Sequence, residues 1–185
     1  TVQNCIIAES LSDSIHVDEG KTQPAPHGTA MLVNRDHENI SIHHNLFAHN
    51  VGRVPTLNET LNPATLIEIA NNVFYDWGNF GNQKWGLFCI RLAAHTNFDI
   101  VNNYFKKGPA GSGEGHVPIR VNAYSASKPD LARRVYVEGN FATEPPANPA
   151  TYYLGVSDND NWRYVELEKA TNASLAAEYM RRAKR

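Results

Sequence analysis

The chain has 185 residues, a formal net charge of −2 at pH 7, 42% hydrophobic residues and 19% charged residues. This length fits one domain with a closed core, and the composition is globular rather than disordered. The small negative charge supplies no basic field for nucleic acid, and no apolar run approaches the roughly 20 residues of a membrane span. We therefore expect no nucleic-acid partner, no membrane association and a monomer.

Two cysteines, Cys5 and Cys89, are too few for a disulfide framework or a four-ligand metal site. We expect both to be interior thiols rather than a bridge. The chain also contains 20 asparagines. Because the asparagine amide bonds neighbouring backbone groups and tolerates tight turns, this number predicts a repeated turn chemistry.

An eight-residue pattern recurs along the chain, with alternating apolar residues at its front and an asparagine near its end. The copies occupy residues 40–47 (ISIHHNLF), 67–74 (IEIANNVF), 98–105 (FDIVNNYF) and 135–142 (VYVEGNFA), with a partial copy at 2–7 (VQNCII). The alternation predicts a strand, and the asparagine stands where that strand bends.

The same bend residue returns at a fixed phase although the loops between copies vary in length. A meander of hairpins would not require this, whereas a stack of parallel coils would. We therefore predict a ladder of stacked bend residues, in which amides hydrogen-bond up and down the column. Its members are Cys5, Asn45, Asn72, Asn103 and Asn140. Further short strands are expected at 29–33, 86–92 and 117–121.

Two segments follow from this pattern: parallel coils over residues 1–144, and a C-terminal loop and helix extension over 145–185. Prolines at 145, 146 and 149 interrupt the repeat, and residues 174–182 have a helical pattern. Since Thr1 already lies inside a copy of the pattern, we expect preceding coils in the parent protein.

Several stretches resemble the pectate lyase family in the order in which that family has them. They are residues 41–55 (SIHHNLFAHNVGRVP), 71–78 (NNVFYDWG), 3–11 (QNCIIAESL) and 27–32 (HGTAML), within a likeness that covers about residues 1 to 142. The resemblance implies an all-β, right-handed parallel β-helix with irregular loops and a short C-terminal helix. It also implies a secreted protein, extracellular or periplasmic, that cleaves pectate or polygalacturonate by Ca²⁺-assisted β-elimination. The calcium ligands would come mostly from residues upstream of residue 1.

In that family an arginine in an Arg-x-Pro context removes the proton next to the sugar carboxylate, and the matching residue is Arg53. A guanidinium in water keeps its proton to above about pH 12, so such a base needs burial beside another cation or alkaline conditions. The family often has a second arginine three or five residues further on, where this chain has Thr56 and Asn58.

Three other residues are candidates for contact with an acidic polysaccharide. His27 stands close to the place where the family has a substrate-binding lysine. Tyr75 and Trp77 follow the second copy of the pattern, at 67–74, where aromatic faces could stack on sugar rings.

Two other functions remain open. One is a non-catalytic β-helix that binds carbohydrate, which the absent second arginine favours. The other is a β-helix glycoside hydrolase, with Glu68 and Asp99 in equivalent outward positions about 4.8 Å apart on successive coils. The histidines at 37, 43, 44 and 49 are expected at turns or on the surface, because adjacent strand residues diverge and do not converge on a zinc ion.

Overall fold

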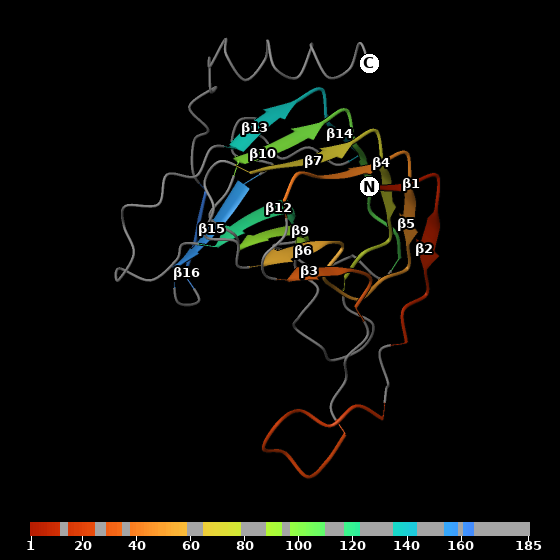
Figure 1. Cartoon of the computed structure of the whole chain (residues 1–185), viewed down its shortest axis with the longest axis vertical. Coiled ribbons are helices and arrows are strands. Elements are labelled where there is room, and N and C mark those ends of the chain that lie inside the picture. The colour runs from red at the N-terminus through yellow and green to blue at the C-terminus, as the bar shows by residue number, and fades with distance from the viewer. Residues whose placement is uncertain are drawn as a thin grey trace.

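The computed structural model describes residues 1–11, 15–24, 29–34, 38–58, 65–78, 88–93, 97–109, 117–122, 135–143, 154–158 and 161–164. Every regular element in these ranges is a β-strand, and the strands form three sheets around a common core (Figure 1). The chain passes through the three sheets in turn, so each sheet takes every third strand. The described part of the chain is therefore all-β, as the sequence predicts.

The first sheet collects the strands at the front of each sequence repeat. Its order is β1 (Val2–Gln3), β4 (Ile40–His43), β7 (Leu66–Ala70), β10 (Asn97–Val101) and β13 (Val135–Glu138). All four pairings are parallel and in register. The predicted alternation is confirmed in this sheet, since the inward side chains Ile42, Ile69 and Ile100 are all fully buried.

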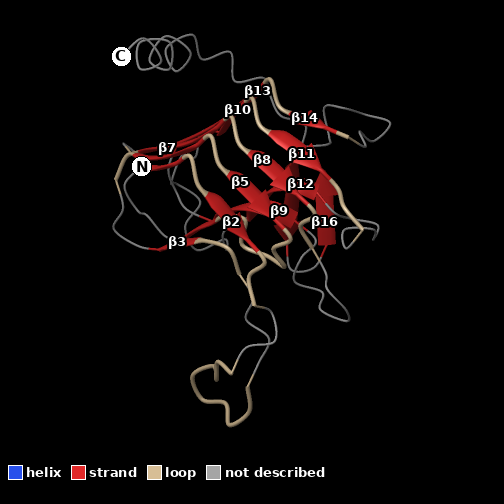
Figure 2. Ribbon diagram, turned by 90° about the vertical axis from the view of Figure 1, so that its right-hand side faces the viewer, coloured by secondary structure: helices blue, strands red, loops and turns tan. Residues whose placement is uncertain are grey.

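The second sheet follows each bend and is seen face-on in Figure 2. It contains β2 (Ile6–Ala8), β5 (Leu46–Ala48), β8 (Val73–Tyr75), β11 (Tyr104–Lys106) and β14 (Phe141–Ala142), again all parallel. Its inward side chains include Phe47, Phe74 and Phe105. These three rings stack with centroids 5.0 Å apart at each step, so successive coils pack through one aromatic column.

The third sheet closes the core. It contains β3 (Leu32–Asn34), β6 (Thr56–Asn58), β9 (Phe88–Ala93), β12 (Val117–Asn122), β15 (Leu154–Asp158) and β16 (Asn161–Tyr164). The neighbours are parallel except for the antiparallel pair β15 and β16. The predicted strands at 29–33, 86–92 and 117–121 correspond to β3, β9 and β12. Strand β6 has no counterpart in the sequence prediction, because three residues after a proline carry too little periodicity to identify.

The asparagines form the predicted ladder between the first and second sheets. The side-chain amide of Asn45 donates to the Oδ1 of Asn72 at 3.0 Å, Asn72 donates to Asn103 at 3.0 Å, and Asn103 donates to Asn140 at 2.9 Å. Each Oδ1 also accepts the backbone N–H of the residue one coil away. The ladder therefore holds the corners between the first and second sheets in one column.

The two thiols differ in exposure. Cys5 stands at the end of the ladder, with its N–H donating to Asn45 Oδ1 at 3.0 Å, but its side chain is exposed. The prediction of an interior Cys5 is therefore wrong, because the ladder covers this residue from one side only. Cys89 is buried as predicted, and its burial raises the pKa of the thiol well above the ordinary value. Both cysteines are free.

The C-terminal part of the chain is described only in two strands. β15 continues the third sheet beyond β12, and β16 folds back on it. The helix predicted at 174–182 lies outside the described residues, and the boundary at 144 stays a prediction. Within the described ranges, no helix has the length and apolar character that crossing a bilayer demands.

Candidate functional site

The segment that carries Arg53 is held between two neighbouring coils of the third sheet. The carbonyl of Arg53 accepts the N–H of Met31 at 2.9 Å, and the N–H of Val54 donates to the carbonyl of Cys89 at 3.1 Å. These bonds bind the segment from both sides before β6 begins. The Arg53 side chain therefore extends from a backbone segment that is held in place on both sides.

The backbone of Arg53 has a φ of +50°, in the left-handed region that few side chains adopt. The turn residues His44, Asn71 and Asn102 have similar values, so this conformation belongs to the corners of the coil. The Arg53 side chain is partly exposed. Its guanidinium forms no hydrogen bond or ion pair with any residue that the structure describes. A cation held in this way can meet an anionic ligand.

Arg91 is the functional candidate that the sequence prediction missed. Its N–H donates to the carbonyl of Pro55 at 2.9 Å, and its register partner on β6 is Thr56. Since Ile90 and Leu92 on either side are fully buried, the partly exposed Arg91 points outward. Arg91 thus stands beside position 56 on the next strand, about 4.8 Å away.

Two further features surround Arg91. Thr56 is 0% exposed, and its hydroxyl has no hydrogen-bond partner in the described part of the chain, so it lies beneath the surface beside Arg91. On the far side, Arg120 of β12 occupies the register position next to Arg91. Thr56, Arg91 and Arg120 thus occupy one register position on three successive strands.

The predicted substrate contacts lie in different places. Tyr75 ends β8 on the second sheet, where it is partly exposed and has the His49 ring edge-on at 5.0 Å. Trp77 is only 2% exposed and packs edge-on against Phe105 at 6.1 Å, so its ring belongs to the core. His27 lies outside the described residues. No contact of the described residues joins Tyr75 or Trp77 to Arg53.

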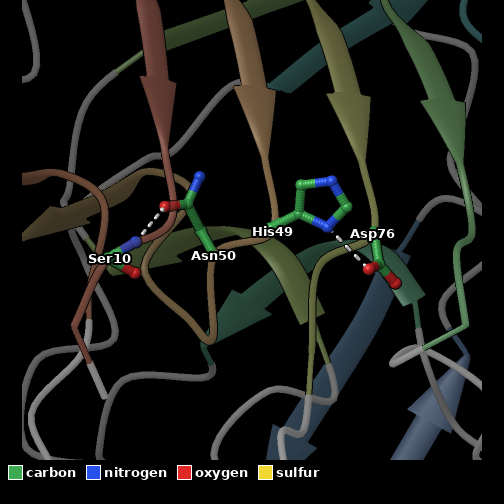
Figure 3. A network of polar contacts seen from close by, with 4 residues as sticks. All are labelled: Ser10, His49, Asn50 and Asp76. Atoms are coloured by element: carbon green, nitrogen blue, oxygen red, sulfur yellow. Dashed lines mark hydrogen bonds and ion pairs between the residues drawn. The ribbon is translucent and has the colours of Figure 1, made fainter. Parts of the chain in front are cut away.

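A buried acid lies at the corner that follows the second sheet. The Nδ1 atom of His49 is 2.8 Å from the Oδ2 atom of Asp76 (Figure 3), and the two side chains are 40% and 2% exposed. Gly108 packs so closely there that a Cβ atom would collide with the Asp76 side chain. Asn50, which directly follows His49, accepts the N–H of Ser10 on the preceding coil at 3.3 Å (Figure 3). These contacts tie corners of successive coils together.

Glu68 and Asp99 are register partners, as the sequence predicts, but they lie on the first sheet. Glu68 accepts a hydrogen bond from the Ser41 hydroxyl, and Asp99 is only 2% exposed. A pair of acids that cleaves a glycosidic bond must reach the sugar from both sides. The burial of Asp99 argues against that use.

The donors for a calcium ion are not assembled in the described part of the chain. Calcium takes six to eight oxygen ligands, several of them carboxylates. No group of three or more His, Cys, Asp or Glu residues with metal-binding geometry occurs within the described ranges. The outward positions beside the Arg53 segment carry Thr56 and Arg91. These residues do not fit Ca²⁺.

Comparison with known proteins gives one relevant likeness. The chain is 26% identical over 136 residues to a protein from Aspergillus flavus described as a probable pectate lyase C. The match covers 69% of this chain and 27% of the fungal protein, so the chain spans about a quarter of that relative's length. No family model matches. The chain is thus distantly similar to a pectate lyase.

Proposed function

We propose that this protein is a polysaccharide lyase that cleaves pectate or polygalacturonate by β-elimination, and that its coils form a right-handed parallel β-helix. The observation that carries the proposal is the backbone hydrogen bond from the N–H of Arg91 to the carbonyl of Pro55. This bond places a second, outward arginine beside the Arg53 segment. The distant similarity to a pectate lyase supports the same assignment.

The chemistry needs a base and a positive group on the sugar carboxylate. In the reaction a proton leaves the carbon next to the carboxylate, a double bond forms to the neighbouring carbon, and the bond from that carbon to the glycosidic oxygen breaks. The leaving oxygen takes a proton from water. Negative charge builds on the carboxylate as the first proton leaves, so a cation placed there lowers the barrier.

Arg53 and Arg91 divide these roles in the proposal. Arg91 binds the carboxylate through its planar guanidinium, which matches two carboxylate oxygens at once. Arg53 removes the proton, which requires it to act in its neutral form. The substrate would be held between the two residues. Tyr75 lies on another sheet, at the end of β8.

Calcium assistance is a separate proposal, because the described residues offer no donor set for it. If calcium is used, activity disappears with a chelator and returns on addition of Ca²⁺. Activity that survives prolonged chelation would contradict the requirement and leave Arg91 as the carboxylate ligand. The substrate class also leads us to propose that the protein is secreted and acts outside the cell as a monomer.

The test follows the ultraviolet absorbance of the unsaturated product during incubation with polygalacturonate. We expect Arg53→Ala to lower kcat by about 10² or more, the range typical of a lost general base. Arg91→Lys keeps the charge but loses the planar guanidinium that binds two carboxylate oxygens. We therefore expect a raised KM and a smaller loss of kcat than in Arg91→Ala. Lys21→Ala, which removes an exposed cation at a turn, is the matched control.

The alternatives give different results in the same assay. A hydrolase releases reducing ends without the unsaturated chromophore, and a non-catalytic carbohydrate-binding protein retains the polymer without cleaving it. Wild-type absorbance no higher than that of Arg53→Ala would overturn the lyase proposal for this substrate.

A further inference from the structure

The outward face of the second sheet carries a continuous exposed apolar row. Ile6, Leu46, Val73, Tyr104 and Phe141 occupy one register position on the five strands. Ile6 is 76% exposed, Val73 is 38% exposed and Phe141 is 62% exposed. Five strands at about 4.8 Å make a row of about 19 Å, which can accommodate several sugar rings. A contiguous apolar patch of this kind marks an interaction site.

Aromatic rings make up part of this face. Tyr104 and Phe141 stack on each other with centroids 5.6 Å apart and planes inclined by 17°, so their facing ring planes cover each other. In the neighbouring row Tyr75 has the Lys106 ammonium 5.4 Å from its ring centroid. Aromatic side chains supply apolar contact area for sugar rings, and tyrosine adds a hydroxyl that can form hydrogen bonds.

The charges of the two described faces that flank the ladder are opposite. The outward positions of the second sheet include one exposed cation, Lys106, and no carboxylate in the described strands. Outward positions of the first sheet carry the partly exposed Glu68 and the exposed Glu138, while Asp99 is buried. The acids that directly follow strands of the second sheet are Asp76, which is buried against His49, and the exposed Glu9 after β2. The described strands of the second sheet therefore offer an acidic ligand a lysine and no carboxylate.

We propose that the outward face of the second sheet is a second binding surface for an acidic polysaccharide, with Tyr75, Tyr104 and Phe141 as the apolar contacts and Lys106 as the carboxylate contact. Figure 2 shows this face toward the viewer. This surface would hold the polymer on the outside of the coils, while Arg53, just before β6, and Arg91 on β9 act on one glycosidic bond. The choice of polymer rests on the proposed function, whereas the surface itself does not.

The experiment measures the affinity for polygalacturonate by calorimetry, with the full chain carrying Arg53→Ala so that no cleavage occurs. Tyr104→Ala combined with Phe141→Ala is expected to weaken binding about tenfold, and Lys106→Glu by a similar factor that shrinks at high salt. Glu138→Gln, an exposed change on the first sheet, is the matched control and leaves the affinity unchanged. A neutral polysaccharide is expected to respond to the aromatic variants and not to Lys106→Glu.

A second readout separates this inference from the lyase proposal. With Arg53 intact, the surface variants raise KM on the long polymer but leave kcat on a short oligosaccharide unchanged. If the protein has no lyase activity but the surface variants still lose polymer binding, the proposed binding surface is supported and only the lyase proposal is rejected. Unchanged polymer affinity in both surface variants would overturn the inference. So would light scattering that shows a dimer that Phe141→Ala dissociates, since the face would then join two copies of the chain.

Discussion

Asn72 shows how one residue type holds a coil in place. Its amide donates to the carbonyl of Ile42 at 2.9 Å and to Asn103, while its Oδ1 accepts both the N–H and the amide of Asn45. The residue is 1% exposed. A buried amide with its donors and acceptors all used is stable only if every partner stays in register.

Replacing Asn72 is therefore expected to destabilise the protein strongly. Asn72→Asp keeps the shape but removes the two donors and places an acceptor against the carbonyl of Ile42. We expect a loss of about 2–4 kcal/mol in the free energy of unfolding, measured by urea denaturation. Asn140→Ala, at the partly exposed end of the described ladder, serves for comparison, and we expect it to lower the free energy of unfolding by less. Equal losses in the two variants would contradict a ladder with a buried centre.

The two cysteines are expected to react differently. Because burial raises the pKa of the Cys89 thiol, that group stays protonated and shielded at mildly alkaline pH, whereas Cys5 is exposed. Iodoacetamide should therefore modify Cys5 in the native protein and reach Cys89 only after unfolding. Mass spectrometry of peptides from both samples checks this result. Rapid native labelling of Cys89 would contradict its placement in the core.

At the scale of elements, the corner after the second sheet depends on close packing between successive coils. Gly108 leaves room for the Asp76 side chain, which holds His49. Gly108→Ala is expected to displace that acid and to destabilise the protein by about 1–3 kcal/mol in urea denaturation. His49→Ala, which removes a half-exposed partner, is expected to cost about 1 kcal/mol. An unchanged free energy of unfolding in Gly108→Ala would show that the Asp76 side chain has another position available.

The strands of the first two sheets could be predicted from the sequence because alternation and the asparagine bend are local signals. The position of Arg91 beside Thr56 could not. It depends on the register between strands 35 residues apart, and loops of variable length separate the copies. The burial of Trp77 could not be predicted either. Its near neighbour Tyr75 is partly exposed, but the corner between the two residues turns Trp77 into the core.

At the scale of the whole molecule, one stack of coils presents three chemically different faces. The first sheet carries acids, the second carries rings with a lysine, and the third carries Arg91 beside the Arg53 segment. Each face is a column of residues that only the register aligns. The proposed reaction and the proposed polymer surface therefore depend on the same stacking.

The register can be measured by cross-linking. In a Cys5→Ser background, Ser41→Cys with Glu68→Cys places two thiols on register partners, about 4.8 Å apart between Cα atoms and within disulfide range. Ser41→Cys with Leu66→Cys is the control, shifted by two residues on the same face to about 8 Å. We predict that mild oxidation joins the first pair and leaves the second reduced. Preferential cross-linking of the shifted pair would contradict the register of the first sheet, and with it the in-register stack of coils.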